Sequence, residues 1–253
     1  AWKTDLSVFA KATYHLSDQW DAFADVQYRH VGFLTDGYND KFQKDANGMY
    51  QAQPLNVDVT YDFLNPKAGF AWHKDGHRAY ASYAMSSREP ERNNFTDNGQ
   101  SGAPRAERLH DVEVGYSYDA KNWYVSAGLY YMGYKDQLVQ TGELSDIGEA
   151  LTTNIEDSYR MGLELSAGYS PWKWLSLDVN GAFSRNRILA FDEHVSYDWD
   201  ESFQVKHYDN STLAFSPSVV LNGMATFRWQ GLKAVWHTNF VSRQYLDNTQ
   251  CLD

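Results

Sequence analysis

Cysteine and long apolar runs are almost absent from this sequence. The single cysteine, Cys251, excludes an internal disulfide and a metal site built from several cysteines. No stretch approaches the roughly 18 apolar residues that a membrane-spanning helix requires. A membrane role would therefore have to come from strands or from surface attachment.

Basic residues and the common catalytic motifs are also scarce. The 22 Lys and Arg residues are outnumbered by 33 Asp and Glu, and the net charge of −11 argues against nucleic acid as a partner. The chain has no phosphate-binding glycine loop, no His-Glu-x-x-His pair and no Gly-x-Ser-x-Gly elbow, and its eight histidines show no metal-ligand spacing. We therefore expect neither an enzyme nor a cofactor.

Aromatic residues, in contrast, are abundant in a chain that is polar on average. The sequence has 18 Tyr, 13 Phe and 9 Trp, and its mean hydropathy is −0.61. Such an average is misleading for a membrane barrel, because lumen-facing polar residues alternate with lipid-facing apolar residues and the two cancel.

Several stretches alternate with a period of two, which predicts strands with unlike faces. In 111–118, Val112, Val114, Tyr116 and Tyr118 share one face and polar or small residues share the other. The same alternation recurs in 5–14, 159–169, 175–183 and 232–240. A soluble antiparallel sheet with one wet face would show it too.

Length and connections favour a membrane barrel over that soluble sheet. The segments often exceed ten residues, whereas strands of soluble domains cluster near five or six. Tight connections are predicted near 16–18, 75–77, 119–122, 170–173 and 230–231, and long ones cover 35–54, 89–107, 137–151 and 189–211. Short turns on one side and long loops on the other are typical of outer-membrane barrels.

Aromatic residues also collect beside the tight turns, on the apolar face or at its end, as a membrane interface selects. They are Tyr14, Trp20, Trp72, Tyr80, Tyr118, Trp123, Tyr169, Trp172, Trp174 and Trp229.

The resulting prediction is an all-β, antiparallel transmembrane β-barrel segment without a helical domain. Its ten strands are predicted at 2–15, 19–34, 55–74, 78–90, 107–118, 123–137, 150–169, 174–190, 212–229 and 232–247.

Specific stretches resemble the TonB-dependent receptor family, in order and over most of the chain. The clearest are Asn65-Pro66-Lys67-Ala68-Gly69, Tyr80-Ala81-Ser82-Tyr83-Ala84 with Arg88-Glu89-Pro90, the strand 107–115, the strands 131–138 and 154–164, and the segment 244–249.

This resemblance implies an integral barrel of about 22 strands in the bacterial outer membrane, closed by an amino-terminal plug. Residues 1–253 would be a partial barrel domain, with the plug and the closing strands absent. The implied partners are outer-membrane lipid, the inner-membrane energy-coupling protein TonB acting through the plug, and a small-molecule or glycan ligand.

The function implied is active import of a scarce nutrient, such as an iron–siderophore complex, haem, cobalamin or a glycan. Two alternatives remain open. One is a small complete barrel with hydrolase activity, for which His110 with Asp111 or His194 with Asp192 would be the catalytic pair. The other is a soluble glycan-binding β domain.

Two sets of polar residues are candidates for contacts. Charged residues on the lumen face are predicted to hydrate the wall and to pair with the plug; they are Asp5, Lys11, Asp21, Asp25, Arg29, Asp111, Glu113, Arg160, Glu164, Asp178, Arg228, Lys233 and His237. Ligand capture in the family is expected at the outer loops, where aromatic and arginine side chains grip a chelate or a sugar. On that analogy the ligand-binding candidates are Tyr38, Tyr50, Arg92, Asn94, Tyr197 and Trp199.

An acidic group in the last long loop, formed by Asp192, Glu193, Asp198, Asp200 and Glu201, has oxygen ligands suited to calcium, but without a regular ligand spacing. We expect a solvated anionic loop there.

Overall fold

The computed structural model describes residues 1–44, 48–96, 103–144, 150–196 and 203–250. They form thirteen strands and one short helix. The elements are β1 (Trp2–Ser17), β2 (Trp20–Thr35), β3 (Tyr38–Lys44), β4 (Tyr50–Pro54), β5 (Val57–Lys74), β6 (His77–Arg88), α1 (Arg92–Thr96), β7 (Glu107–Asp119), β8 (Trp123–Leu144), β9 (Ala150–Trp172), β10 (Leu175–Ser196), β11 (Phe203–Thr212), β12 (Val219–Trp229) and β13 (Leu232–Val241).

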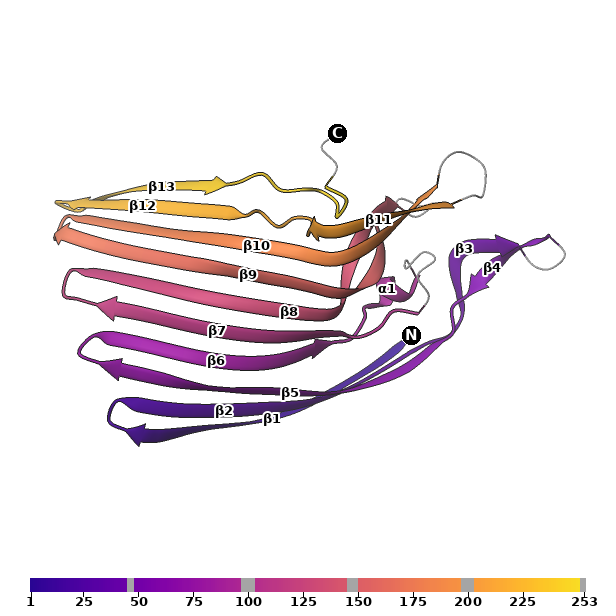
Figure 1. The fold of residues 1–253 in the computed structure, drawn as a ribbon, viewed down its shortest axis with the longest axis horizontal. Coiled ribbons are helices and arrows are strands. Elements are labelled where there is room, and N and C mark those ends of the chain that lie inside the picture. The colour runs from indigo at the N-terminus through magenta and orange to yellow at the C-terminus, as the bar shows by residue number, and fades with distance from the viewer. Residues whose placement is uncertain (45–47, 97–102, 145–149, 197–202, 251–253) are drawn as a thin grey trace.

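Eleven of these strands make one antiparallel sheet, the main sheet, in the order β1-β2-β5-β6-β7-β8-β9-β10-β12-β13, with β11 added to β10. Figure 1 shows these strands side by side, with the tight turns at one end and the longer connections at the other. The expected fold class, long antiparallel strands of one barrel-type sheet, is confirmed. No helix in the described part of the chain is long and apolar enough to cross a membrane.

The prediction of ten strands was incomplete. Strands β3 and β4 pair only with each other, and β11 continues the pairing of β10 beyond β12. These three strands and α1 lie within segments predicted to be long loops. Strands β3 and β4 were missed because a hairpin that leaves the sheet lacks one consistently buried face, so its residues do not alternate in polarity.

The register confirms the predicted faces of the main sheet. Neighbours in register share a face, so Val114 lies beside Ala81 and Leu129, while Glu113 lies beside Ser82 and Tyr130. We call the face of Val114 the apolar face and the face of Glu113 the polar face. All thirteen charged residues predicted to share one face lie on the polar face.

The turns follow from their residue types. Asp75-Gly76 and Gln230-Gly231 each adopt two successive positive φ angles, of 48° and 85° and of 43° and 85°. This is the type I′ geometry whose twist matches that of paired strands. One predicted turn was displaced, because β9 continues through Trp172 and turns at Lys173-Trp174 rather than at 170–173.

Aromatic side chains form a row at the tight-turn end of the apolar face, as predicted. The rings of Trp172 and Trp174 stack at 4.8 Å, and those of Tyr118 and Trp123 lie 5.0 Å apart. Tyr80 was wrongly included in this row. It lies on the polar face, because its register partners are Gly115 of β7 and Ala71 of β5, and it shares the face of Ser82 and Glu113.

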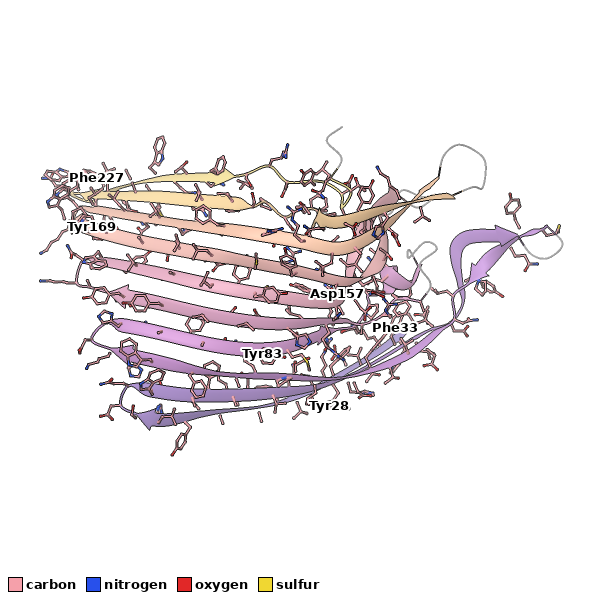
Figure 2. The ribbon with its side chains drawn as sticks, viewed as in Figure 1. Tyr28, Phe33, Tyr83, Asp157, Tyr169 and Phe227 are labelled. Atoms are coloured by element: carbon pink, nitrogen blue, oxygen red, sulfur yellow. The ribbon has the colours of Figure 1, made fainter. Side chains whose placement is uncertain are left out.

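A second aromatic row crosses the apolar face farther from the tight turns, and we call it the outer row. It consists of Tyr28, Tyr83, Tyr131 and Tyr159, and the rings of Tyr131 and Tyr159 stack at 6.0 Å. Figure 2 shows Tyr169 and Phe227 at the tight-turn end, with Tyr28 and Tyr83 toward the other end. Eight to ten residues separate the rows on β2, β8 and β9, which corresponds to roughly 20–25 Å for strands tilted by about 40°.

The segment Asn65-Pro66-Lys67-Ala68-Gly69 marks the place where the sheet divides. The pairing of β5 with β6 ends at Lys67, whereas the pairing of β5 with β2 continues past Pro66 to Val57. Proline has no N–H to donate to a neighbouring strand, so it is suited to a position where one ladder stops. Beyond this point β6 stays with β7 alone.

Four glycines on the polar face lie directly beneath an aromatic ring of the neighbouring strand. A Cβ atom added to Gly69, Gly115, Gly162 or Gly168 would collide with the ring of Phe23, Tyr80, Tyr130 or Tyr124, respectively. Each glycine is the register partner of the residue that covers it. The pairs fill the surface of a single-layer sheet, which has no second layer to pack against.

A small core lies at the loop end, where β8, β9 and β10 extend past the rest of the sheet. It contains Val139, Ile155, Ile188, Phe191 and Leu213. The tail folds back onto it through Asn248, which is 1% exposed, accepts the N–H of Ala214 at 2.9 Å and donates to the carbonyl of Gln140 at 2.6 Å.

Candidate functional site

The residues that follow β6 fold across the polar face, and they form the first part of the candidate site. We call residues 89–106 the β6–β7 loop; 97–102 lie outside the described part. Its first residue, Glu89, follows the end of β6, beyond the place where the sheet divides, and reaches back to β1 and β2. Lys3 Nζ donates to Glu89 Oε1 at 2.9 Å, and Arg29 donates to both carboxylate oxygens at 2.8 and 2.9 Å.

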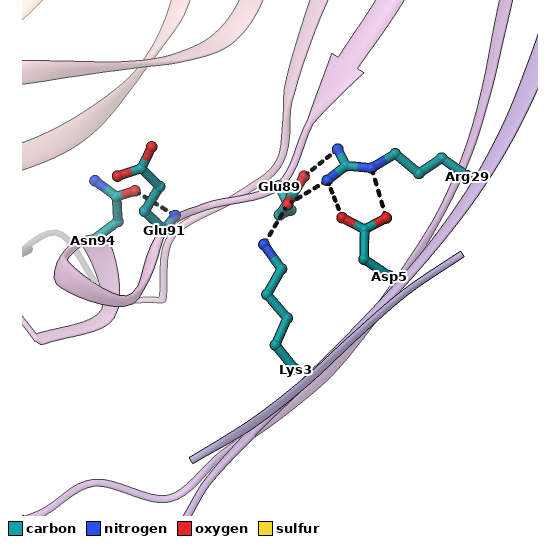
Figure 3. Close-up of polar contacts among 6 residues, drawn as sticks. All are labelled: Lys3, Asp5, Arg29, Glu89, Glu91 and Asn94. Carbon is teal, nitrogen blue, oxygen red and sulfur yellow. Dashed lines mark hydrogen bonds and ion pairs between the residues drawn. The ribbon is translucent and has the colours of Figure 1, made fainter. Parts of the chain in front are cut away.

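Arg29 is shared between two carboxylates, as Figure 3 shows. Its guanidinium also donates to both oxygens of Asp5, at 3.0 and 2.6 Å. The side chain of Glu89 is only 10% exposed. Because Lys3, Asp5, Arg29 and Glu89 come from three segments, this group, which we call the Glu89 cluster, attaches the β6–β7 loop to the polar face.

The environment of Glu89 keeps it ionised. Burial by itself would raise its pKa, but the hydrogen bonds from Lys3, from its own backbone and from Arg29 outweigh burial, and the pKa lies below the ordinary value of 4.5. The carboxylate therefore carries its charge at neutral pH.

Further contacts extend the β6–β7 loop across the sheet. The ring of Phe95 stacks on Phe33 of β2 at 5.7 Å. Asn94 accepts the N–H of Glu91 at 2.6 Å and donates to Thr152 of β9 at 3.1 Å. Four other strands lie between β2 and β9 in the main sheet, so these contacts make the loop a brace between two distant strands.

The end of the β6–β7 loop is held just as firmly. Arg105 Nε donates to Asp136 at 2.7 Å, and the side chain of Asn154 bonds both the N–H and the carbonyl of Arg105. The two described parts of the loop, 89–96 and 103–106, are therefore both held to the sheet.

A hollow of about 350 Å³ opens on the polar face farther along the sheet. Its charged lining consists of Glu113, Arg160 and Glu164, and the segment 215–217 forms a lip. Arg160 Nη1 donates to Ser216 Oγ at 3.1 Å, which holds the lip in place. The hollow can contact a polar group of either charge.

The predicted ligand-binding residues do not converge. Tyr38 is 76% exposed and Tyr50 70% exposed, at opposite ends of the β3–β4 pairing. Arg92 is exposed at the start of α1, whereas Asn94 is buried and both groups of its amide are hydrogen-bonded within the protein. Tyr197 and Trp199 lie outside the described residues.

Of the acidic group in the last long loop, only the side chain of Asp192 is described. Its Oδ1 lies 2.5 Å from His207 Nδ1, and Asp209 lies 3.1 Å from the other ring nitrogen. Hydrogen bonds to Asp192 and Asp209 raise the pKa of His207. Asp192 is thus part of the β10–β11 pairing.

The prediction that His110 and Asp111 form a catalytic pair is wrong. The two are consecutive residues of β7, so they lie on opposite faces, and the His110 ring bonds Tyr83 at 2.8 Å instead. The side chain of His194 lies outside the described residues, and Asp192 pairs with His207.

The sequence did not reveal Glu89, Lys3 or Phe95 as part of a site. Glu89 belongs to the motif Arg88-Glu89-Pro90, but the sequence around a single acidic residue after a strand does not indicate which distant residues it contacts. Only the folding of the β6–β7 loop brings the partners together.

Together, the long antiparallel strands, the alternating faces, the two aromatic rows and the loop folded over the polar face define the wall of an outer-membrane-type β-barrel. Residues 3–250 match the model of the TonB-dependent receptor-like β-barrel family, and the chain belongs to that family.

Solved structures show the same fold. The copper transporter OprC superimposes with a TM-score of 0.73 at 15% identity, over 97% of this chain and 37% of that one. The siderophore receptor PiuA from Acinetobacter baumannii gives 0.70 at 14% identity, over 98% and 34%. The ferric yersiniabactin uptake receptor FyuA from Yersinia pestis gives 0.67 at 18%, over 98% and 36%. The chain spans about a third of the length of each, and a comparison with curated proteins returned no match.

Proposed function

We propose that this chain is part of the barrel wall of an active importer in the bacterial outer membrane. The observation that carries the proposal is the β6–β7 loop, which is fixed across the polar face by the Glu89 cluster. A barrel of this family whose lumen is crossed by a loop and filled by a plug restricts free diffusion, so passage of a solute requires energy or rearrangement.

The parent protein would supply the rest of the transporter. The open edges of β1 and β13 need partner strands in a membrane, since unpaired backbone groups are costly in hydrocarbon. We infer that further strands close a barrel of about 22 strands and that a plug occupies the lumen. Glu113, Arg160 and Glu164 would contact the plug, and TonB would act on the plug from the inner membrane.

The cargo is proposed by class. The matching structures are named as transporters or receptors for copper, iron and siderophores, which favours a metal chelate over haem, cobalamin or a glycan. Tyr38, Tyr50 and Arg92 are exposed and remain our candidates for ligand contacts, with Asn94 fixing the backbone beside Arg92. Tyr197 and Trp199 stay predictions. Membership of a β-barrel family argues against the soluble glycan-binding alternative. His110 and Asp111 lie on opposite faces of β7, so they do not support the hydrolase alternative.

Uptake measurements test this function. Cells with and without the parent gene, each with and without TonB, would be given radiolabelled ferric siderophores, copper, haem and cobalamin. We expect the uptake of one metal complex to require both genes. Uptake that needs the parent gene but is unchanged without TonB would identify a passive pore and contradict the proposal.

A further inference from the structure

Charged side chains lie on the apolar face beyond the outer row, on the side away from the tight turns. His30 and Tyr28 both bond Asp62, at 2.8 and 2.6 Å, and Lys135 pairs with Asp157. These groups lie on the side of the strands that faces lipid in a barrel, just past the aromatic ring level. They satisfy one another, so they need no outside partner.

Two arginines at this level differ from their neighbours. Arg108 of β7 and Arg185 of β10 are exposed, and within the described residues neither side chain makes a hydrogen bond or an ion pair. By register, Arg108 lies beside Lys135, and Arg185 lies beside Met161, the partner of Tyr131. Arg187, two residues past Arg185, donates only to the carbonyl of Asn210, at 2.9 Å.

The charge here is opposite to that of the chain as a whole. Arg108, Lys135, Arg185 and Arg187 are four cations with Asp157 among them, in a chain of net charge −11. Three strand spacings, about 14 Å, and a register offset of four residues, about 13 Å, separate Arg108 from Arg185, so the two lie about 20 Å apart. Between them lie the stacked rings of Tyr131 and Tyr159. We call these six cationic and aromatic residues the rim patch.

We propose that the rim patch binds the phosphate groups of an anionic lipid in the outer leaflet. A guanidinium held against the membrane interface has lipid headgroups as its nearest available partners. Phosphate accepts two parallel hydrogen bonds from arginine, which makes it the headgroup chemistry that fits best. The tyrosine rings provide an amphipathic surface for the part of the headgroup that joins the phosphates to the acyl chains.

This proposal rests on the placement of the chain in an outer membrane but not on its cargo. Uptake and lipid binding can fail independently, so the two tests are distinguishable.

The test compares lipid binding by two double variants of the intact parent protein. R108Q/R185Q removes the two unpaired cations of the rim patch. K74Q/K173Q removes two exposed cations at the tight-turn end and serves as the matched control. The side chains of both pairs are exposed and make no hydrogen bonds or ion pairs within the described residues, so folding should be preserved, which heat-dependent gel mobility verifies. Native mass spectrometry then measures the binding of diphosphoryl lipid A to each detergent-solubilised protein.

We expect R108Q/R185Q to weaken binding roughly 25-fold, about fivefold for each cation near an anionic headgroup, and K74Q/K173Q to change it less than twofold. Monophosphoryl lipid A should bind the wild type more weakly than the diphosphoryl form. Equal binding by wild type and R108Q/R185Q would overturn the proposal. So would complete displacement of the lipid by inorganic phosphate at equal concentration, because the site would then be one for free anions.

Discussion

At the scale of the residue, the glycines of the polar face leave the space that the aromatic rings of the neighbouring strands occupy. Gly115 and Gly128 are register partners on the polar face of β7 and β8. The ring of Tyr80 occupies the space where a Gly115 side chain would begin, whereas nothing lies within 4 Å of a Cβ added to Gly128.

We therefore predict that Gly115→Ala destabilises the parent barrel by about 1–3 kcal/mol, as overpacking commonly does, and that Gly128→Ala changes stability much less. Urea unfolding of the barrel in lipid vesicles measures both. Adding Tyr80→Ala should recover part of the loss, since the ring would no longer oppose the new methyl group. Equal effects of the two alanines would show that the covering ring does not constrain Gly115.

At the scale of the element, the position of the β6–β7 loop depends more on the contacts of the Glu89 carboxylate than on the stability of α1. α1 has five residues, too few to be stable alone. Glu89 instead ties the start of the loop to Lys3 and Arg29. The neighbouring Glu91 is exposed, which makes it a matched control.

We predict that Glu89→Gln loosens the β6–β7 loop and that Glu91→Gln does not. Losing charged hydrogen bonds to a largely buried group costs about 1–3 kcal/mol, so amide hydrogen exchange in α1 of the parent protein should rise roughly tenfold or more. Unchanged protection in Glu89→Gln would mean that the Phe95–Phe33 stack holds the loop unaided.

The same contact predicts a dependence on pH. Because the folded pKa of Glu89 lies below the ordinary 4.5, its stabilisation is fully present above that value and is lost as the pH falls through the folded pKa. Corrected exchange rates in α1 should be constant from pH 7 to 5 and then rise in the wild type, whereas Glu89→Gln should show no such step. A step of equal size in the variant would assign it to another carboxylate.

At the scale of the whole molecule, the main sheet is a single layer with two open edges. All residues of β1 and β13 are exposed, and each strand leaves backbone groups unpaired on one side. Such edges are incompatible with the hydrocarbon of a bilayer.

We predict that residues 1–253, produced without further strands, do not form a barrel in detergent. The full parent protein should resist protease and migrate faster on gels before heating than after. The isolated segment should be digested and show no such shift. A protease-resistant, heat-modifiable segment would show that β1 and β13 close on each other.

The sequence determined the properties that depend on neighbours along the chain. Alternation of polarity is a local pattern, so the faces of the five alternating stretches, from 5–14 to 232–240, were predicted correctly. The tight turns at Asp75-Gly76 and Gln230-Gly231 and most of the aromatic row near them were equally readable, because each depends on residue types a few positions apart.

Only the tertiary structure decided what depends on distant partners. The Glu89 cluster joins residues 3, 5, 29 and 89, the brace of the β6–β7 loop joins β2 to β9, and the rim patch joins β7 to β10. The members of each group are far apart in the sequence. The sequence does not show whether the partner of a charged residue is water, a carboxylate or a lipid. The register and the path of the loop set those distances, and the energy of an ionic contact depends on distance and burial rather than on residue type alone.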